Sequence, residues 1–205
     1  MLASDPLPAP EKARVGRDLQ RYSADGERLL AGCIPIRMKS SKDGMAGVEV
    51  LLVSSRGSSK GLVFPKGGWE TDEDVEAAAA RETIEEAGVR GRLEVPMLGR
   101  FRYVGKPDRR HTAGTQVACV VHMFVMHVAE ELQTWPEQEQ RQRHWCSVEE
   151  ACAKCRHEWM REALLTWMQQ RGWSLPAQLP AGSQPPLDAP QNTCNGQVNG
   201  LPVAS

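Results

Sequence analysis

The segment GGWETDEDVEAAAARETIEEAGV, residues 67–89, is the most informative part of the sequence. It predicts a helix over Thr71–Ala87, because Thr71 with Asp74 resembles a capping box and Gly88 is a natural helix stop. Four alanines at 77–80 keep this helix narrow. A helix with a defined start and end is therefore expected here.

Three glutamates, Glu82, Glu85 and Glu86, share one face of this helix, because residues at i, i+3 and i+4 are neighbours on a helix surface. Their like charges repel, and a hard divalent cation such as Mg²⁺ resolves the repulsion. Arg81 can pair with Glu85, or with Glu73 before the helix, and hold the carboxylates in register. A solvated acidic helix face is the alternative, and the three glutamates taken alone favour it.

Directly upstream, Pro65, Lys66, Gly67 and Gly68 are interpreted as a tight turn. Glycine has no Cβ, so its backbone can approach a metal ion or a phosphate closely. This segment is therefore a candidate to supply main-chain atoms to a ligand.

The rest of the sequence alternates strand and helix signals. Strands are predicted at residues 29–37, 48–54, 61–64, 93–103, 117–128 and 142–146. The segment 117–128 is apolar on both faces and should be central in a sheet. A short helix is expected to open at Ser147 with Glu150 in a capping box, followed by a helix over Glu158–Arg171. This order predicts an α/β fold, an α/β/α sandwich around a mixed β-sheet.

Composition limits the classes of function. The 205 residues hold 25 Lys and Arg against 26 Asp and Glu, so no bulk charge indicates a nucleic acid or membrane partner. A transmembrane helix is excluded because the chain has no run of about 18 apolar residues. Six cysteines are too dilute for a disulfide scaffold and favour a reducing compartment. We therefore expect a cytoplasmic monomer, with the nucleus or an organelle as alternatives.

Proline marks both ends of the chain. Nine of the 14 prolines lie at or before Pro10 or from Pro176 onward. Between 172 and 205 the only charged residue is Asp188, and such a segment cannot offset about 1–2 kcal/mol of backbone entropy per residue. We predict a disordered segment at 1–16, a folded domain at 17–171 and a disordered tail at 172–205.

The spacing within residues 67–89 closely resembles the Nudix box. It reads Gly67, five residues, Glu73, seven residues, Arg81-Glu82, two residues, Glu85-Glu86, one residue, Gly88-Val89. One departure is Thr83, where the family usually has an aliphatic residue. Because Thr is similar in volume to Val, we expect a small packing loss and unchanged chemistry.

The resemblance implies a Nudix-type α/β/α sandwich and hydrolysis of diphosphate linkages that depends on Mg²⁺, with Mn²⁺ as a substitute. It implies Glu82 and Glu86 as metal ligands, joined by the carbonyl of Gly67. Glu85 is the candidate base that activates water, with Arg81 beside it in the catalytic set. Whether Glu82 or Glu85 is the base stays open.

Stretches outside the box narrow the resemblance. FPKGGWE, TWPEQEQRQRHW and CRHEWMREAL are similar to plant and algal enzymes related to diphosphoinositol polyphosphate and diadenosine polyphosphate phosphohydrolases. The likeness spans residues 17–170 and implies a small-molecule polyphosphate substrate. Arg28 falls where the diphosphoinositol enzymes carry a basic substrate contact, whereas Leu30 falls where they carry another.

Basic residues agree with a polyanionic substrate. Between 100 and 111 the only acid is Asp108, and Arg forks bind phosphate in bidentate fashion. We take Arg28, Lys66, Arg109 and Arg110 as candidate substrate-binding residues. The alternative is a solvated basic loop.

Two other functions stay open: a general nucleotide-sugar or dinucleotide pyrophosphatase, and a non-hydrolysing protein that binds polyphosphate ligands. The presence of all three box glutamates argues against the second. Glu137 and Glu139 could offer the metals a further carboxylate, as in some family members, but surface solvation is the favoured interpretation.

Overall fold

The computed structural model describes residues 12–39, 44–56, 61–105 and 117–175. Its strands are β1 (Arg28–Met38), β2 (Val48–Ser54), β3 (Leu62–Val63), β4 (Lys66–Gly68), β5 (Val89–Leu93), β6 (Gly99–Gly105), β7 (Val117–Glu131) and β8 (Arg143–Ser147). Its helices are α1 (Val75–Ala87), α2 (Val148–Lys154) and α3 (Glu158–Gln170), with a 3₁₀ turn at Gly44–Gly47. Contacts divide the chain into Met1–Leu175 and Pro176–Ser205, and the second unit lies outside the described residues.

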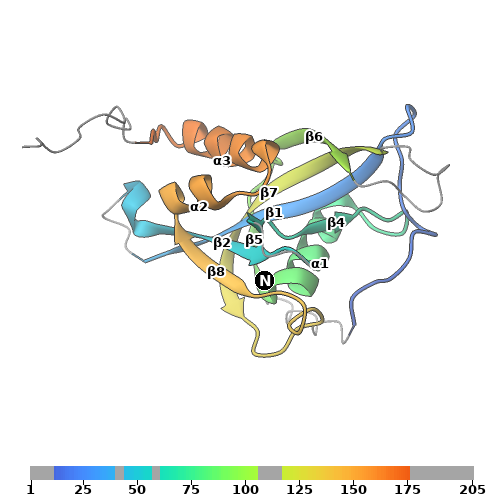
Figure 1. The fold of residues 1–205 in the computed structure, drawn as a ribbon, viewed down its shortest axis with the longest axis horizontal. Coiled ribbons are helices and arrows are strands. Elements are labelled where there is room, and N and C mark those ends of the chain that lie inside the picture. Colours follow the sequence, from blue (N-terminus) through green and yellow to red (C-terminus); the bar gives the residue numbers. More distant parts are fainter. Residues whose placement is uncertain (1–11, 40–43, 57–60, 106–116, 176–205) are drawn as a thin grey trace, which may run out of the picture. The chain divides into compact units, whose positions relative to one another are not determined.

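A mixed sheet forms the centre of the first unit. Its strands lie in the order β3-β2-β1-β7-β5, with β4 beside β1, β6 beside β7 and β8 beside β2. β1 and β7 are parallel, and the other pairs are antiparallel. α1 packs against β1, β4 and β5, whereas α2 and α3 pack against β2 and β6 on the other side of the sheet (Figure 1). The predicted fold class, an α/β/α sandwich around a mixed sheet, is confirmed.

Strands β1 and β7 carry the core because helices cover both of their faces. Leu30, Ile34 and Ile36 of β1 and Phe124 and Met126 of β7 are each at most 2% exposed. Burial of this apolar surface is the main favourable contribution to folding. The prediction that 117–128 is a central strand is confirmed.

The strand predicted over 93–103 is two strands, so that prediction is wrong. β5 ends at Leu93 and β6 begins at Gly99, and both pair with β7. Pro96 lies in the connection and has no N–H to donate to a strand ladder.

The segment before α1 is extended, not a tight turn. β4 pairs antiparallel with β1, with Gly67 opposite Ala31 and Lys66 opposite Gly32. A Cβ at Gly32 would overlap Pro65 and Lys66, so close approach of the strands requires glycine there. Gly32 thus serves the close packing of β1 on β4, which the sequence signal for a turn did not reveal.

The N-cap of helix α1 lies three residues after Thr71, the predicted cap. Asp74 is the N-cap, and its side chain accepts a hydrogen bond of 2.7 Å from the backbone N–H of Ala77. At the other end Gly88 adopts φ 60°, and its N–H donates to the carbonyl of Ile84. The capping box of Ser147 and Glu150 at the start of α2 is present as predicted.

Thr83, the departure from the usual aliphatic residue, is fully buried in α1. Its hydroxyl donates a 2.7 Å hydrogen bond to the carbonyl of Ala79 one turn earlier. The buried polar group is therefore satisfied, which removes the main cost of placing Thr in the core.

Packing continues beyond Arg171, the predicted end of the domain. The Trp173 ring packs edge-on against Trp167, with centroids 5.2 Å apart, and Leu175 also lies against the core. Residues 176–205 lie outside the described residues, so the disordered tail stays a prediction. Among the residues that the structure describes, no helix is long and apolar enough to cross a membrane.

The end of α1 generates a stability prediction. A Cβ at Gly88 would meet the Trp135 ring and the Arg143 guanidinium in addition to the strain of the left-handed backbone. We expect Gly88→Ala to lower the free energy of unfolding by more than about 2 kcal/mol. Gly172→Ala is the matched control, because Gly172 has φ 68° at the end of α3 but open space around it. It should cost about 1 kcal/mol.

Urea unfolding followed by tryptophan fluorescence gives both values. Equal losses in the two variants would show that the contacts around Gly88 contribute nothing.

Candidate active site

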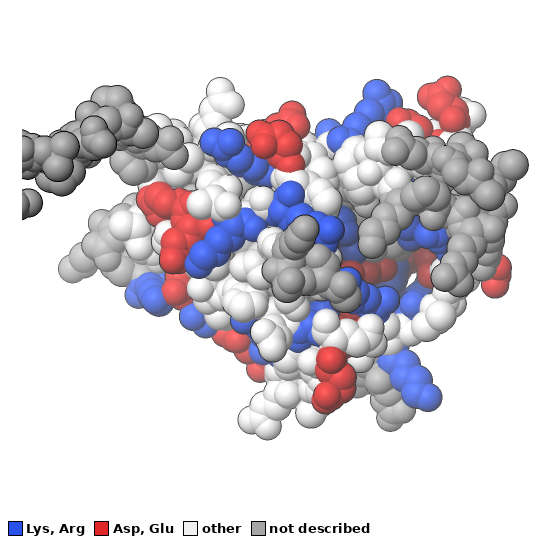
Figure 2. All heavy atoms as spheres, viewed as in Figure 1, with Lys and Arg blue, Asp and Glu red and all other residues white. Residues whose placement is uncertain are grey.

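The three glutamates of α1 lie together in the structure. Glu82, Glu85 and Glu86 are 9%, 3% and 6% exposed, although charged carboxylates are rarely buried. They line a pocket of about 240 Å³, the carboxylate pocket, with Arg28 and Lys66 also in its wall. Figure 2 shows Lys and Arg side chains gathered across the middle of this face, with acidic side chains in a recess beside them. The interpretation as a merely solvated helix face does not fit this burial.

Arg81 holds the pocket together through both of the partners expected from sequence. Its guanidinium donates two hydrogen bonds to Glu73, at 2.9 and 2.7 Å, which is a bidentate pair. It also contacts Glu82 at 2.8 Å, Glu85 at 3.4 Å and the carbonyl of Gly68 at 2.8 Å. One side chain thus joins the loop before α1, strand β4 and the helix.

Arg141 plays a similar part for the other end of the cluster. Its guanidinium donates to Glu86 and, at 2.7 Å, to Glu137, and it reaches the carbonyl of Ser54 at 3.1 Å. The second oxygen of Glu86 accepts the backbone N–H of Lys66 at 3.0 Å. Both carboxylate oxygens of Glu86 are therefore fixed before any ligand binds.

Glu137 belongs to the carboxylate pocket, and the expectation that it is solvated is wrong, whereas Glu139 is exposed as expected. It is 4% exposed and pairs with Arg56 and Arg141. Its backbone N–H donates to the carbonyl of Glu85 at 3.1 Å, which ties the 135–141 turn to α1. Two arginines compensate its burial, so it remains in the pocket at low cost.

The environment of the pocket favours neutral carboxyl groups. Burial raises the pKa of Glu82 to about 8, and the charge of Glu86 adds to the rise. Burial likewise raises the pKa of Glu85 and of Glu86. Crowded carboxyl groups with raised pKa values bind protons or cations readily, because either relieves the repulsion.

Gly67 lies directly against this cluster. A Cβ at this position would overlap the carboxylate of Glu82. The missing side chain therefore makes room for Glu82 beside the backbone of β4.

The donor chemistry of the pocket suits a divalent metal, because hard cations select carboxylate and carbonyl oxygens. In the described ranges, no three acidic, His or Cys side chains are arranged to ligate one ion together. Arginines hold Glu82, Glu86 and Glu137 instead. The residues therefore fit a metal by donor type, with the arginines as the present counterions.

The described part of the N-terminal segment also reaches the pocket. The backbone N–H of Arg14 donates to Glu85 at 3.2 Å, and its side chain pairs with Glu70 and Asp72. Arg14 falls within residues 1–16, for which the sequence predicted disorder.

Of the predicted substrate-binding residues, Arg28 and Lys66 line the carboxylate pocket. Arg28 is oriented by a 2.7 Å hydrogen bond to Gln20. Arg109 and Arg110 lie outside the described residues. Gly105 and Val117, which flank that segment, are the ends of β6 and β7.

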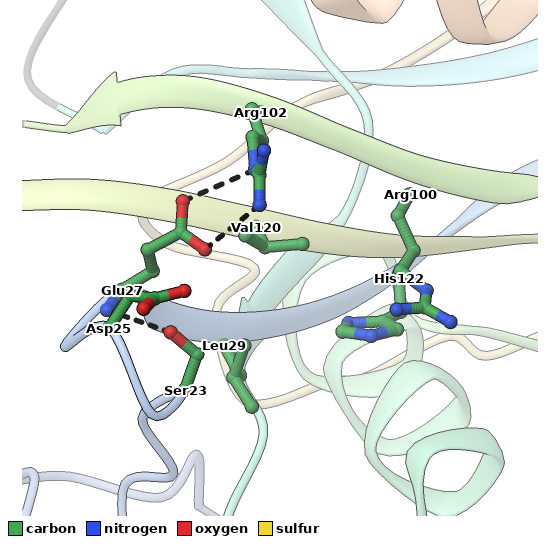
Figure 3. A pocket seen from close by; sticks show the side chains of 8 residues that line it. All are labelled: Ser23, Asp25, Glu27, Leu29, Arg100, Arg102, Val120 and His122. Atoms are coloured by element: carbon green, nitrogen blue, oxygen red, sulfur yellow. Dashed lines mark hydrogen bonds and ion pairs between the residues drawn. The ribbon is translucent and has the colours of Figure 1, made fainter.

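The described part of the predicted basic cluster lies elsewhere. Arg100 and Arg102 line a separate pocket of about 510 Å³ with His122 and Glu27 (Figure 3). Successive strand residues point to opposite faces, so these arginines lie across the sheet from Tyr103. Arg102 is paired with Glu27, at 3.2 Å, and is not aimed at the glutamates of α1.

Sequence reasoning missed Arg56 and Arg141 and undervalued Glu137. Arg56 precedes residues 67–89 and Arg141 follows them, and only the fold brings both side chains to the pocket. The signal that existed was the spacing of Glu137 and Arg141, which are i, i+4 neighbours in the WPEQEQR stretch.

Comparison with known proteins agrees with this geometry. Residues 28–168 match the NUDIX domain family. Nudix hydrolase 21, chloroplastic, of Arabidopsis thaliana is 46% identical over 172 residues, covering 81% of this chain and 82% of the relative. Nudix hydrolase 16, mitochondrial, of the same plant is 49% identical over 158 residues, covering 75% and 86%.

Solved structures show the same fold. A Nudix hydrolase from Nitrosomonas europaea superposes with a TM-score of 0.53 at 17% identity, covering 73% of this chain and 93% of that one. A C. elegans Ap4A hydrolase binary complex gives a TM-score of 0.50 at 20% identity, covering 70% and 97%. With residues 28–168 matched and close relatives over most of its length, the chain belongs to the NUDIX family and is a hydrolase of diphosphate linkages.

Proposed function

We propose that this Nudix hydrolase acts with Mg²⁺ on diphosphoinositol polyphosphates, diadenosine polyphosphates or both, and that Mn²⁺ can substitute. The observation that carries the proposal is the carboxylate pocket, where buried glutamates with raised pKa values share a wall with Arg28 and Lys66. Carboxylates bind a divalent metal, and Arg28 and Lys66 bind phosphate oxygens. The pocket therefore offers neighbouring ligands for the metal and for the polyphosphate of one complex.

Each residue has a role in the proposed mechanism. Glu82 and Glu86, with the carbonyl of Gly67, would hold the metal, which when bound neutralises the diphosphate and makes water more acidic. Glu85 takes a proton from the water molecule. The water oxygen attacks phosphorus as the bond to the leaving phosphate breaks. The contact of Glu82 with Gly67 supports Glu82 as the ligand and Glu85 as the base.

Arg81 positions the carboxylates. Its bidentate pair with Glu73 fixes the guanidinium, and that guanidinium contacts both Glu82 and Glu85. Glu137 is a further carboxylate for the metal, because it lines the same pocket and is held by Arg141.

A nucleotide-sugar or dinucleotide pyrophosphatase is the alternative activity. The fold neighbour named as an Ap4A hydrolase supports diadenosine polyphosphates among the candidates. A non-hydrolysing binder is disfavoured by the family relationship, since the relatives are named as hydrolases. We propose a monomer in the cytoplasm, with chloroplast or mitochondrion as alternatives that the names of the relatives raise.

The catalytic roles can be separated by substitution. Glu85→Gln keeps the shape of the side chain and removes the base, so kcat should fall by about 10²–10⁴-fold. Glu82→Gln and Glu86→Gln should also raise the Mg²⁺ concentration needed for half-maximal rate. Glu76→Gln is the control, because Glu76 is exposed on the same helix. If all three pocket variants match the control in rate and Mg²⁺ dependence, the mechanism is wrong.

Gly67→Ala tests the close approach of β4 to Glu82. The added methyl group would meet that carboxylate. We therefore expect a higher Mg²⁺ concentration for half-maximal rate and a kcat at least tenfold lower. The melting temperature should change little. Gly99→Ala is the control, since its added methyl group would meet only the Phe101 ring at 3.3 Å. Unchanged metal dependence in Gly67→Ala would place the metal away from β4.

The substrate class is tested with a panel of a diphosphoinositol polyphosphate, a diadenosine polyphosphate, ADP-ribose and a nucleotide sugar, each with Mg²⁺. Products are read as phosphate and nucleotide, and kcat/KM should be highest for the first two. Replacing Arg109 and Arg110 with Ala should raise KM more as the number of substrate phosphates grows, because each well-formed contact to phosphate is worth roughly 1.5–3 kcal/mol. A panel in which nucleotide sugars lead would favour the alternative activity.

A further inference from the structure

Residues 13–16, which we call the N-terminal strap, lie beside the carboxylate pocket. Arg14 and Gly16 of the strap line this pocket together with Glu85. The backbone N–H of Arg14 donates to a carboxylate oxygen of Glu85 at 3.2 Å, across 71 positions in sequence. The residue proposed as the base therefore accepts a hydrogen bond from the main chain of the strap.

The Arg14 side chain anchors the strap to the loop before α1. Its guanidinium donates to Glu70 and to both carboxylate oxygens of Asp72, at 2.9 and 3.1 Å. Such partly exposed pairs contribute little individually. The same two segments are also joined through the main chain, because the N–H of Thr71 donates to the carbonyl of Leu19 at 2.7 Å. The strap therefore has a defined position beside the pocket.

The strap is the principal support of the Glu85 carboxylate. Among the described residues each of its oxygens has one donor: Arg81 lies 3.4 Å from Oε1, and the N–H of Arg14 lies 3.2 Å from Oε2. Only the second distance falls within the range of about 2.7–3.2 Å that is usual for N–H···O hydrogen bonds. Arg81 also divides its donors between Glu73 and Glu82. The orientation of Glu85 therefore depends mainly on Arg14.

This contact leaves Glu85 able to act as a base. A carboxylate has about four lone-pair sites, so one donor on each oxygen leaves sites for a water molecule. A proton can be taken only when the base lies within hydrogen-bond reach of the water. Because a misplacement of about 1 Å can lower a rate about 100-fold, a fixed carboxylate raises kcat. The binding of substrate does not depend on it.

We propose that Arg14 is a positioning residue, whose main-chain N–H holds Glu85 in the orientation that accepts a proton from the attacking water. The inference rests on the proposed function, because Glu85 is the base there. The proton passes from the water to Glu85, and Arg14 neither gains nor loses one. The N-terminal strap, for which the sequence predicted disorder, thus contributes to hydrolysis.

Three substitutions at position 14 separate the N–H from the side chain. Arg14→Pro removes both, Arg14→Ala removes only the side chain, and Arg14→Lys keeps a cation for Glu70 and Asp72. With the best substrate of the panel, kcat should fall at least tenfold in the Pro variant, about threefold in the Ala variant and less in the Lys variant, with KM within about twofold. Val15→Pro is the matched control, because Val15 is 98% exposed and no described residue accepts a hydrogen bond from its backbone N–H.

A double-mutant cycle shows whether Arg14 acts through Glu85. In Glu85→Gln, where the base is absent, the addition of Arg14→Pro should change kcat by less than about twofold. A further loss as large as that in the wild-type background would show that Arg14 acts on another group, and it would overturn the proposal. Circular dichroism melting checks that each variant folds.

Amide hydrogen exchange measured by NMR tests the contact without turnover. In the wild type the N–H of Arg14 should exchange at least about tenfold more slowly than the N–H of Val15. This difference should disappear in Glu85→Ala, which has no acceptor at that position. Equal exchange of the two amides in the wild type would overturn the proposal even if no variant at position 14 folded.

The outcomes separate the role of Arg14 from the proposed function. If nucleotide sugars lead the panel, the proposed substrate class falls, and a loss of kcat in Arg14→Pro on those substrates still supports the inference. Near-native kcat in Glu85→Gln would overturn both the base and the role of Arg14. A low kcat in Glu85→Gln, with equal kcat in Arg14→Pro and Val15→Pro, would overturn the role of Arg14 alone. A rise of kcat in Arg14→Pro would also overturn it, because the strap would then obstruct the base.

Discussion

The bidentate pair between Arg81 and Glu73 is the interaction on which the site depends. Glu82 and Glu85 lie in a buried pocket, where unpaired carboxylates would cost several kcal/mol each. The Arg81 guanidinium contacts both, and it can do so only because Glu73 and the carbonyl of Gly68 hold it in one orientation. The hydrogen bonds raise the pKa of Arg81 although burial opposes the rise, so the cation is permanent. The pocket is thus stabilised by a charge that cannot titrate away.

Much of this arrangement could be predicted from the sequence because it is local. The register of Glu82, Glu85 and Glu86 follows from helix geometry, and the contacts of Arg81 follow from one turn of helix and the loop before it. The burial of β7 follows from an apolar pattern on both faces. One local prediction failed: residues 93–103 were predicted as one strand, whereas β5 and β6 pair separately with β7 on either side of Pro96.

The long-range part of the site could not be predicted. Arg141 reaches Glu86 across 55 positions in sequence, and Arg56 reaches Glu137 across 81. No periodicity links such residues; they meet because β2 and β8 pair and bring the ends of their strands to α1. Strand alternation likewise decides that Arg100 and Arg102 face away from Tyr103, although all three lie within four residues. The basic residues that lie close together between 100 and 111 in sequence therefore need not face the same site.

The turn that carries Glu137 is fastened to α1 at several points. The N–H of Leu132 donates to Gly88 at 2.8 Å, the N–H of Glu137 donates to Glu85, and the Arg143 guanidinium lies 3.7 Å from the centre of the Trp135 ring. During evolution, these contacts constrain the length of the segment between Leu132 and Glu137 more than its amino-acid composition. A single insertion between Leu132 and Glu137 would move the carboxylate by one residue, up to about 3.3–3.6 Å along the chain, and out of the pocket. Drift in this segment should therefore proceed by substitution, while changes in length accumulate elsewhere.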